Sequence, residues 1–353
     1  MTTIAVPTGA VTVGVDTHKD IHVAAVLDEV GRLLGSSGFP TDPAGNAALI
    51  GWVEQHGSIT RVGVEGTGSY GAQLTRDLQR AGHHVIEVDR PDRKARRLRG
   101  KDDHLDAEAA ARAVLSGRAT TVPKARDGQI EAIRALRVAR RSCVTGRTVA
   151  MNQLKALLVS GPQDLREQLR VLSSTQLIKT AARLRPADDL TDPLNATKYA
   201  MREIGLRHQF LTEQLKRLDA TLRPLVVAAA PALVARFAVG TDTAGALLVA
   251  VGDNPGRLRS ESSFAHLCGV APLPASSGKT SGRYRLNRGG DRRANNALWR
   301  IVLVRMGTDQ RTRDYVAKRT SQGKSKPEIM RCLKRYVARE IYAALTDPRL
   351  DEL

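Results

Sequence analysis

Residues 11–27 decide the fold, and they read VTVGVDTHKDIHVAAVL. A β-branched run, Val11–Val15, ends at Asp16, and a second apolar run begins at Ile21 after a short polar turn. Apolar runs joined by so few residues are typical of a β-hairpin. A third run, Arg32–Phe39, follows another short turn, so the chain begins as an antiparallel meander of three strands.

Helix and strand patterns alternate after this meander. Helical spacing is found at Asn46–Gln55, Ala72–Ala81 and Asp103–Leu115, and short apolar runs at Arg61–Val64 and His84–Val88. The resulting order, βββαβαβα, is that of the RNase H-like fold, and we expect an α/β N-terminal domain of this type. The glycine-rich stretch Gly66–Gly71 predicts a tight turn, because it has neither the Walker nor the dinucleotide-binding spacing.

Four acidic residues occupy positions typical of a catalytic site. Asp16 and Glu65 end the first and fourth strands, while Asp103 and Asp106 begin a helix. Their i, i+3 spacing puts the two helical carboxylates on one face. Carboxylates that converge at strand ends would bind two Mg²⁺ ions, which can hold the attacking and leaving oxygens of a phosphodiester.

Each of these acids also has an ordinary structural interpretation. Asp103 and Asp106 would complement the helix dipole, and Asp16 or Glu65 could be turn residues. Asp102 competes with Asp103 as a ligand, since it lies four residues before Asp106. The whole set in fold order is nevertheless far less expected by chance than any one member.

The charge of the chain is unevenly distributed. The 353 residues carry a net charge of +19, yet residues 1–112 contain 13 Lys/Arg and 15 Asp/Glu, so the basic excess lies entirely in the remainder. Such a charge on a folded chain favours a polyanionic partner, namely DNA, RNA or an anionic membrane surface. Aromatic residues make up only 3%, too few for base stacking to be the main mode of nucleic-acid binding.

Several other classes of protein are excluded by composition. The apolar runs fall far short of the ~20 residues of a membrane span, and Met1–Ala10 lacks the pattern of a signal peptide. The cysteines, Cys143, Cys268 and Cys332, are too scattered for a zinc finger or a disulfide framework. We therefore expect a protein of the reducing cytoplasm.

The middle of the chain is helical and basic. Ile130–Leu158 has apolar residues at helical spacing and an arginine-rich opposite face. Tyr199–Leu222 has a similar pattern, which we expect Pro224 to stop. Two such helices fit an antiparallel hairpin, a coiled coil between protomers or a bundle within one chain. The arginines suit a phosphate backbone, although a solvated face is the ordinary role of a charge run.

The last third contains a second region of chemical interest. Gly240–Ala246 weakly resembles a helix-hairpin-helix, whose backbone amides bind phosphate, and it leads into an apolar helix ending at Gly252. A short helix is expected at Ser260–Cys268 and another at Ala294–Met306. Between them, a Ser-Ser-Gly-Lys loop at 276–279 precedes an arginine-rich stretch. This loop either contacts phosphate or carries a nucleophilic serine, and the residues alone favour the first interpretation.

Four motifs together resemble the DEDD-type insertion-sequence transposases, a family related to pilin-gene invertases and described as RNA-guided bridge recombinases. The motifs are Gly14–Lys19, Glu65–Tyr70, Lys101–Ala107, and Gly269–Pro272 followed by Ser277-Gly278 and Gly290-Asp291. Each motif is loose alone, but all four in order are specific. The third motif selects Asp103 and Asp106 and leaves Asp102 as the variable position.

The resemblance implies three domains and a covalent mechanism. We place a RuvC-like domain at 1–125, a helical coiled-coil linker at 126–230 and a mainly α-helical transposase domain at 231–345. Ser277, with Ser276 as the alternative, would form a 5′-phosphoserine intermediate during DNA cleavage and strand exchange. The implied ligands of Mg²⁺ (or Mn²⁺) are Asp16, Glu65, Asp103 and Asp106.

The resemblance also implies partners. These are double-stranded donor and target DNA, a noncoding bridge RNA that reads sequence by pairing, and further copies of the chain in a dimer or tetramer. Such a protein works at the bacterial nucleoid, without a membrane. From charge alone, the residues expected to hold phosphates are Lys279, Arg283, Arg285, Arg288, Arg292 and Arg293.

Two other functions compete with recombination. The first is a metal-dependent, structure-specific nuclease that uses water and the four acids alone. The second is a non-catalytic nucleic-acid-binding protein that has kept the fold.

Overall fold

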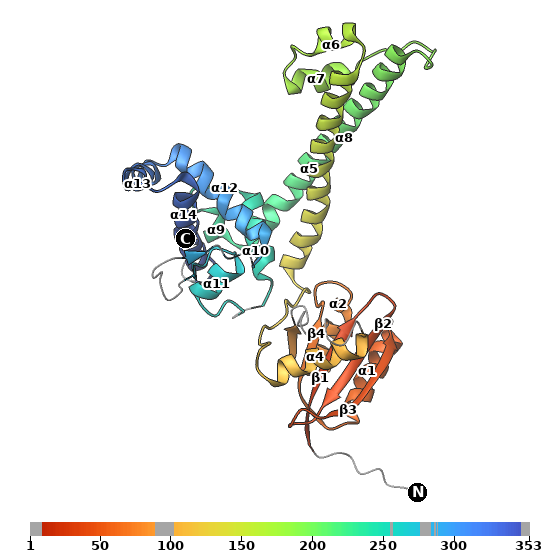
Figure 1. Cartoon of the computed structure of the whole chain (residues 1–353), viewed down its shortest axis with the longest axis vertical. Helices are drawn as coiled ribbons and strands as arrows, with labels where there is room; N and C mark the ends of the chain where they lie inside the picture. Colours follow the sequence, from red (N-terminus) through yellow and green to blue (C-terminus); the bar gives the residue numbers. More distant parts are fainter. Residues whose placement is uncertain are drawn as a thin grey trace. The chain divides into compact units, whose positions relative to one another are not determined.

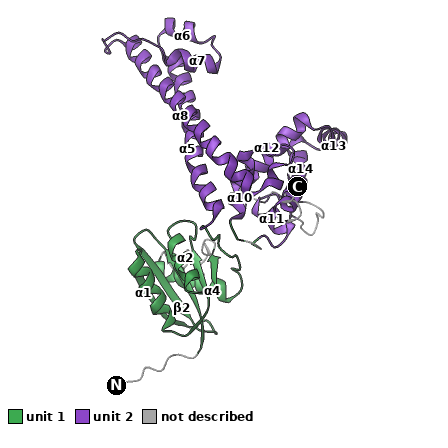
Figure 2. Cartoon of the chain, turned by 180° about the vertical axis from the view of Figure 1, so that it is seen from behind, with its two compact units in different colours: residues 1–126, 253–257 green, residues 127–252, 258–353 purple. Residues whose placement is uncertain are grey.

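The computed structural model describes residues 9–88, 102–254, 257–275, 284–285, 287 and 289–346. The chain forms two compact units (Figure 2). The first unit comprises residues 1–126 together with 253–257, and the second comprises residues 127–252 and 258–353. The division into three domains stays a prediction.

A five-stranded sheet forms the centre of the first unit (Figure 1). Its strands are β1 (Ala10–Thr17), β2 (Ile21–Leu27), β3 (Leu33–Pro40), β4 (Ser58–Glu65) and β5 (Val85–Val88). The spatial order is β3-β2-β1-β4-β5, in which β1 to β3 form an antiparallel meander and β4 and β5 run parallel to β1. The structure confirms the predicted meander, and this mixed α/β architecture is consistent with a RuvC-like fold.

Helices cover both faces of this sheet. They are α1 (Pro43–Glu54), α2 (Ala72–Arg80) and α4 (Asp103–Leu115), which confirms the predicted order βββαβαβα. Leucines of α1 and α2 pack with Val13, Val15 and Val64 in one core. On the other face, alanines of α4 pack against β2 and β5. Because strand side chains alternate between faces, Gly14 and Asp16 lie on the face covered by α4.

Two glycines let α4 approach the sheet closely. A Cβ atom at Gly14 would lie 2.2 Å from the Ala107 carbonyl oxygen, and a Cβ atom at Gly63 would lie 2.6 Å from a methyl group of Val114. The two glycines are paired across β1 and β4. The absence of side chains at these two positions therefore lets α4 lie directly against β1 and β4.

The chain returns to the first unit at residues 253–257. The Oδ1 atom of Asn254 accepts a hydrogen bond from the Ala125 backbone N–H at 2.8 Å, and its Nδ2 atom donates to the Pro123 carbonyl at 2.8 Å. One side-chain amide thus satisfies two backbone groups on the segment that leaves the sheet.

Two long helices form an antiparallel pair in the second unit. They are α5 (Gln129–Ser160) and α8 (Pro193–Ala229), which lie side by side (Figure 1). Cys143 Sγ lies 3.7 Å from Gln214 Oε1, whereas Arg140, one turn earlier on α5, contacts Asp219, further along α8. This is a hairpin within one chain, and a coiled coil between protomers stays a prediction.

Two short helices cover the far end of the α5–α8 pair. They are α6 (Gln163–Leu169) and α7 (Ser174–Ala181), and their leucines enclose a small core with Leu154 and Met201. Ser173 and Gln176 form a capping box at the start of α7, which satisfies backbone donors that a free helix end would leave unpaired.

The prediction that Pro224 stops the second long helix is wrong, since α8 continues to Ala229. A proline inside a helix costs about 3 kcal/mol. Leu222 and Val226, on either side of it, are fully buried in the core of this unit. Burial of each side chain contributes roughly 2 kcal/mol, which is enough to offset the cost of the proline.

Short helices pack around one core in the rest of the second unit. They are α9 (Pro231–Val234), α10 (Thr241–Val251), α11 (Glu261–Leu267), α12 (Arg292–Thr308), α13 (Gln310–Ser321) and α14 (Lys326–Thr346). The three helices expected from the sequence in this region correspond to α10, α11 and α12. A two-residue pairing joins β6 (Leu273–Pro274) to β7 (Tyr284–Arg285). Among the described residues, every helix is too short or too polar to cross a membrane.

The contact between α4 and the sheet can be tested at Gly14. We expect Gly14→Ala to destabilise the first unit by about 3 kcal/mol, because overpacking against backbone atoms cannot be relieved by a rotamer change. Gly51→Ala is the control, since a Cβ at Gly51 has nothing within 4 Å and alanine favours the interior of α1. Urea unfolding measures both, and equal stability of the two variants would contradict the expectation.

Candidate functional site

Asp16 lies at the centre of the candidate site. It is the penultimate residue of β1 and only 5% of its surface is exposed. The next residue, Thr17, donates a hydrogen bond from Oγ1 to the Glu65 carbonyl at 2.8 Å. This bond holds the carboxyl ends of β1 and β4 together, so that the positions of Asp16 and Glu65 are fixed by the sheet.

The start of α4 brings two further acids to this edge. Asp102 caps the helix, because its Oδ1 atom accepts a hydrogen bond from the His104 N–H at 2.8 Å. Asp103 is the first helical residue and is partly exposed, whereas Asp106, one turn later, is buried. Asp102 therefore serves as the cap, and the carboxylates of the first turn lie closer to the sheet.

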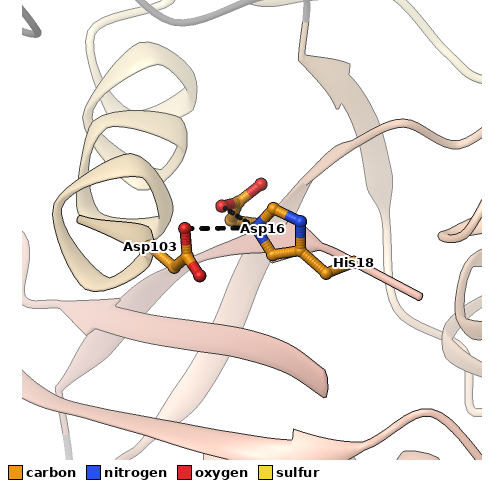
Figure 3. Close-up of side chains that lie close together, drawn as sticks. All are labelled: Asp16, His18 and Asp103. Atoms are coloured by element: carbon orange, nitrogen blue, oxygen red, sulfur yellow. Dashed lines mark hydrogen bonds and ion pairs between the residues drawn. The ribbon is translucent and has the colours of Figure 1, made fainter. Parts of the chain in front are cut away.

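His18 lies between the strand acid and the helix acid (Figure 3). Its Nε2 atom is 3.0 Å from Asp16 Oδ2 and 3.2 Å from Asp103 Oδ1. One ligand atom from each of the three residues falls within 4.8 Å of the other two. Among the described residues, Asp16, His18 and Asp103 are therefore the candidate ligands of a metal ion.

The sequence interpretation missed His18, although the motif that contains it was identified. The signal was its place two residues after Asp16, since alternate residues of an extended chain point to the same side. The His18 side chain is partly exposed, with 38% of its surface accessible to solvent. A solvent-facing histidine beside a buried acid thus closes the outer side of the cluster.

Burial raises the pKa of the Asp16 carboxyl above its ordinary range. The charges of Asp106 and Asp103 raise this pKa further, while the charge and hydrogen bond of His18 lower it. The site therefore concentrates negative charge where water is scarce. A divalent cation relieves such repulsion, and the donor set of carboxylate oxygens and one imidazole nitrogen fits it.

The structure brings the four predicted acids to the same face but not into one cluster. Asp16 and Asp103 belong to the close group, and Asp106 is near enough to affect the pKa of Asp16. Glu65 is half-buried at the end of β4, and Val64 before it pairs with Val15 before Asp16. Glu65 is thus adjacent by strand register. Metal ligation by each acid stays a prediction.

A basic cavity in the second unit contains two of the predicted phosphate-binding residues. Arg292 and Arg293, at the start of α12, line a cavity of about 620 Å³. Four arginines of α5 and one further residue of α12 share its wall: Arg134, Arg137, Arg140, Arg141 and Arg300. The arginine-rich face predicted for the first long helix is therefore part of a cationic hollow rather than a dispersed solvated surface.

Asp242 organises three of these arginines. Its Oδ1 atom accepts hydrogen bonds from Arg137 Nη1 at 2.8 Å and Arg140 Nη1 at 3.0 Å, and its Oδ2 atom contacts Arg300. Burial opposes ionisation, but the surrounding guanidinium groups outweigh it and lower the pKa of Asp242. This carboxylate at the first turn of α10 therefore joins α5, α10 and α12.

The remaining predicted residues have different outcomes. Arg285 is exposed on β7. Asp291 caps α12, accepting hydrogen bonds from the Arg293 and Ala294 backbone N–H groups. Outside the described residues lie Ser276, Ser277, Lys279, Arg283 and Arg288.

Comparisons with known proteins agree with this architecture. A family model described as "Transposase", for DEDD transposases of the IS110 type, matches residues 13–161. A second, described as "Transposase IS116/IS110/IS902 family", matches residues 232–317. Together the two matches cover about two thirds of the chain.

Two curated relatives come from insertion elements. The chain is 30% identical over 137 residues to an uncharacterized 43.6 kDa protein of insertion element IS110 from Streptomyces coelicolor, a match covering 38% of this chain and 34% of the relative. It is 31% identical over 100 residues to an uncharacterized 42 kDa protein of insertion element IS900 from Mycobacterium paratuberculosis, covering 28% and 25%. The matches thus span about a third and a quarter of these relatives.

The carboxylate cluster lies in the region matched by the first model, and residues of both matched regions line the basic cavity. On these matches the chain belongs to the IS110/IS116/IS902 family of transposases.

Proposed function

We propose that the chain is a site-specific DNA recombinase of an insertion sequence, which cuts and rejoins donor and target DNA. The observation that carries the proposal is the cluster of Asp16, His18 and Asp103 at the carboxyl end of a buried strand. A buried acid with a raised pKa beside other acids is expensive to maintain for stability alone. Its position therefore favours a role in metal-dependent phosphodiester chemistry.

The proposed reaction begins with the hydroxyl of Ser277. Its oxygen attacks the phosphorus of the DNA backbone, the bond from phosphorus to the 3′ oxygen breaks, and the hydroxyl proton goes to the leaving 3′ oxygen. The product is a 5′-phosphoserine and a free 3′-hydroxyl. A 3′-hydroxyl of the partner strand then attacks the phosphoserine and releases Ser277, so that no phosphodiester energy is lost.

The acids of the first unit would hold Mg²⁺ or Mn²⁺. A bound divalent ion supplies charge stabilisation at the phosphate oxygens and makes a nearby hydroxyl more acidic. Asp16 and Asp103 are the best-placed ligands, and Asp106 and Glu65 complete the predicted set. His18 Nε2 lies 3.0 Å from Asp16 Oδ2, and this contact orients the carboxylate.

The proposed partners follow from the basic cavity and the low aromatic content. Seven arginines around one cavity, against Asp242 and Asp291, favour a nucleic-acid backbone. Contacts of this kind carry little sequence information. We therefore propose that sequence choice is delegated to pairing with a noncoding bridge RNA. We also propose a dimer or tetramer as the active form.

Hydrolysis by water is the second candidate function. The carboxylate cluster alone contains the groups that a metal-dependent nuclease needs, because two-metal sites cut phosphodiesters without a protein nucleophile. The two candidates differ in whether a covalent protein–DNA adduct forms.

Substitution of the serines distinguishes these mechanisms. We expect wild-type protein to form a denaturant-resistant adduct with DNA carrying the element's end. Ser277→Ala should abolish both the adduct and recombination, because no other hydroxyl occupies the motif position. Ser276→Ala should retain activity within about tenfold. Gel electrophoresis of labelled DNA measures each product.

Two results would reverse this conclusion. Cleavage by Ser277→Ala, with no adduct in the wild type, would support the water-dependent nuclease. Loss of the adduct in Ser276→Ala, with Ser277→Ala active, would move the nucleophile to Ser276.

The metal site can be tested through the stability of Asp16→Asn. The pKa of Asp16 is raised in the folded state, so its ionisation destabilises the fold as pH rises through and above the ordinary carboxyl range. In EDTA at neutral pH, Asp16→Asn should therefore melt at a higher temperature than the wild type. At acidic pH, where both forms are uncharged, this difference should disappear.

Added Mg²⁺ or Mn²⁺ should have the opposite effect. It should stabilise the wild type, by about 2.7 kcal/mol when the ion is at a hundredfold excess over its Kd, and leave Asp16→Asn unchanged. Asp20→Asn, at an exposed position four residues away, is the control and should respond as the wild type does. Equal metal stabilisation of Asp16→Asn would exclude Asp16 as a ligand.

A further inference from the structure

A second basic cavity lies beside α14. This helix lies outside both regions that the family models match. Its volume is about 840 Å³, and its walls are formed by the segment Gly269–Pro272, by β7 and by one face of α14. Six of its lining residues are cationic: Arg285, Lys324, Arg331, Lys334, Arg335 and Arg339. The acid in the same lining is Glu328.

The basic face of α14 results from helical spacing. Arg331, Arg335 and Arg339 recur every four residues and therefore form one stripe. The neighbouring stripe, which includes Ile329 and Val337, is buried in the core of the second unit. The core contact holds the helix in place, and the basic stripe beside it lines the cavity.

The acids near this cavity already have other partners. The Oε2 atom of Glu328 accepts hydrogen bonds from the backbone N–H and the hydroxyl of Ser325, at 2.9 and 2.7 Å. Glu261 of α11 contacts both Arg335 and Arg339. These carboxylates therefore cap a helix and anchor two arginines rather than neutralise the whole stripe.

Two of the remaining cations, Arg331 and Lys334, lie on α14. In the described part of the chain, no carboxylate lies within ion-pairing distance of Arg331 or Lys334. Lys334 donates from Nζ to the neutral Oδ1 atom of Asn295 at 2.9 Å. Burial and the charge of Arg331 both lower the pKa of Lys334, as expected for a cation held where an anion would stabilise it.

Asn295 connects this lysine to the base of the β6–β7 pair. Its Nδ2 atom donates to the Cys268 carbonyl at 2.8 Å and to the Gly269 carbonyl at 3.2 Å. Gly269 and Gly290 pack so closely that a Cβ atom at Gly290 would lie 2.7 Å from the Gly269 nitrogen. Lys334 is thus joined through Asn295 to Cys268 and Gly269, at the start of the segment that lines the cavity.

Described residues on either side of the predicted nucleophile in the sequence lie at this cavity. Leu273 pairs with Arg285 and Pro274 with Tyr284, so β7, which lines the cavity, is joined to the strand that directly follows the lining segment Gly269–Pro272. Tyr284 and Tyr336 also line it, and 67% and 54% of their surfaces are exposed. Exposed rings beside cations suit a nucleotide, because the ring can stack on a base while the cations bind its phosphate.

We propose that this cavity binds a phosphodiester of the DNA strand that is cut, with Arg331 and Lys334 as its phosphate-binding residues. Lys334 is rigidly placed through Asn295, whereas the exposed Arg331 offers a planar, bidentate donor. The inference rests on the proposed recombinase function for the identity of the strand. The cationic cavity itself does not depend on which serine is the nucleophile.

The test compares two double variants of equal charge. One is Arg331→Gln with Lys334→Gln; the control is Arg313→Gln with Lys318→Gln, at exposed positions of α13 that do not line this cavity. All proteins carry Ser277→Ala, so that binding is measured without cleavage. Fluorescence anisotropy gives the Kd for a duplex of the element's end, over a series of salt concentrations, and for an RNA duplex of equal length.

The cavity variant should reduce the slope of log K against log salt for DNA by about two, since each lost phosphate contact contributes about 0.9. The control should keep the wild-type slope. Equal slopes for the two double variants would overturn the proposal, and so would a loss confined to RNA. Arg331→Gln alone, which changes an exposed residue, should reduce the slope by about one; an unchanged slope there also counts against the proposal.

A neutral methylphosphonate placed at successive positions of the DNA identifies the bound phosphate. At one position it should weaken binding to the wild-type cavity by about tenfold and have no effect on the cavity variant. If the methylphosphonate has this effect at none of the positions, the proposal is overturned. Failure of the serine assay, with this coupling intact, would instead remove the proposed covalent mechanism and leave the phosphate site in place.

Discussion

The close contact of α4 with β1 and β4 is the constraint on which the candidate metal site depends. Gly14 and Gly63 remove the side chains that would hold the helix off the sheet. Since the helix begins at Asp103, its first turn is brought to the carboxyl end of β1. A helix displaced by the thickness of a methyl group would separate Asp103 from His18 and Asp16. The geometry of the site therefore depends on Gly14 and Gly63 as well as on the acids.

The buried carboxylates at the carboxyl end of β1 destabilise the fold locally, and the surrounding hydrophobic core compensates for this. Asp16 is buried beside two other carboxylates, which raises its pKa and makes its charged form unfavourable. The valines of β1 and β4 are fully buried between α1, α2 and the sheet. Their packing keeps the backbone fixed, so the repulsion cannot be relieved by movement of the strand. Protonation of Asp16 or a bound cation would relieve this repulsion.

In the second unit the clustered charges are positive rather than negative. Arginines gathered on α5 and α12 repel one another, and Asp242 binds three of them from the first turn of α10. Glu261 has the same role for Arg335 and Arg339. In each place a single acid anchors some cations of a cluster and leaves the others to an external anion. The cations that we propose to bind phosphate at the α14 cavity are therefore distinct from the arginines that Glu261 anchors.

The first unit was predictable because its signals are local. Strands of alternating or continuous apolar residues, short turns and helix starts identified every strand and helix named there, and the acids at their ends followed. The sequence did not predict a role for His18, because no sequence spacing is typical of a histidine that contacts acids on two different elements. Its role depends on Asp103, 85 residues later, reaching it across space.

The second unit was less predictable, because its important contacts join distant positions. Pro224 carries a strong local signal for a helix end, but the buried Leu222 and Val226 outweigh it. The partnership of Asp242 with Arg137 spans 105 residues and cannot be inferred from either segment. The basic stripe of α14 is visible in the sequence as a charge run, but only the fold shows that it borders a cavity.

Residues 253–257 show how strongly the first unit depends on sequence beyond its apparent end. Arg257 donates to the Val122 carbonyl at 3.1 Å and lies 3.8 Å from Glu87. Glu87 in turn accepts a hydrogen bond from the buried Thr67, just after the end of β4. Without this segment, a buried hydroxyl would be held only by an acid that had lost its cation. The acidic edge of the sheet is therefore supported by a basic residue from the second half of the chain, and residues 253–257 belong to the same compact unit as the α/β fold.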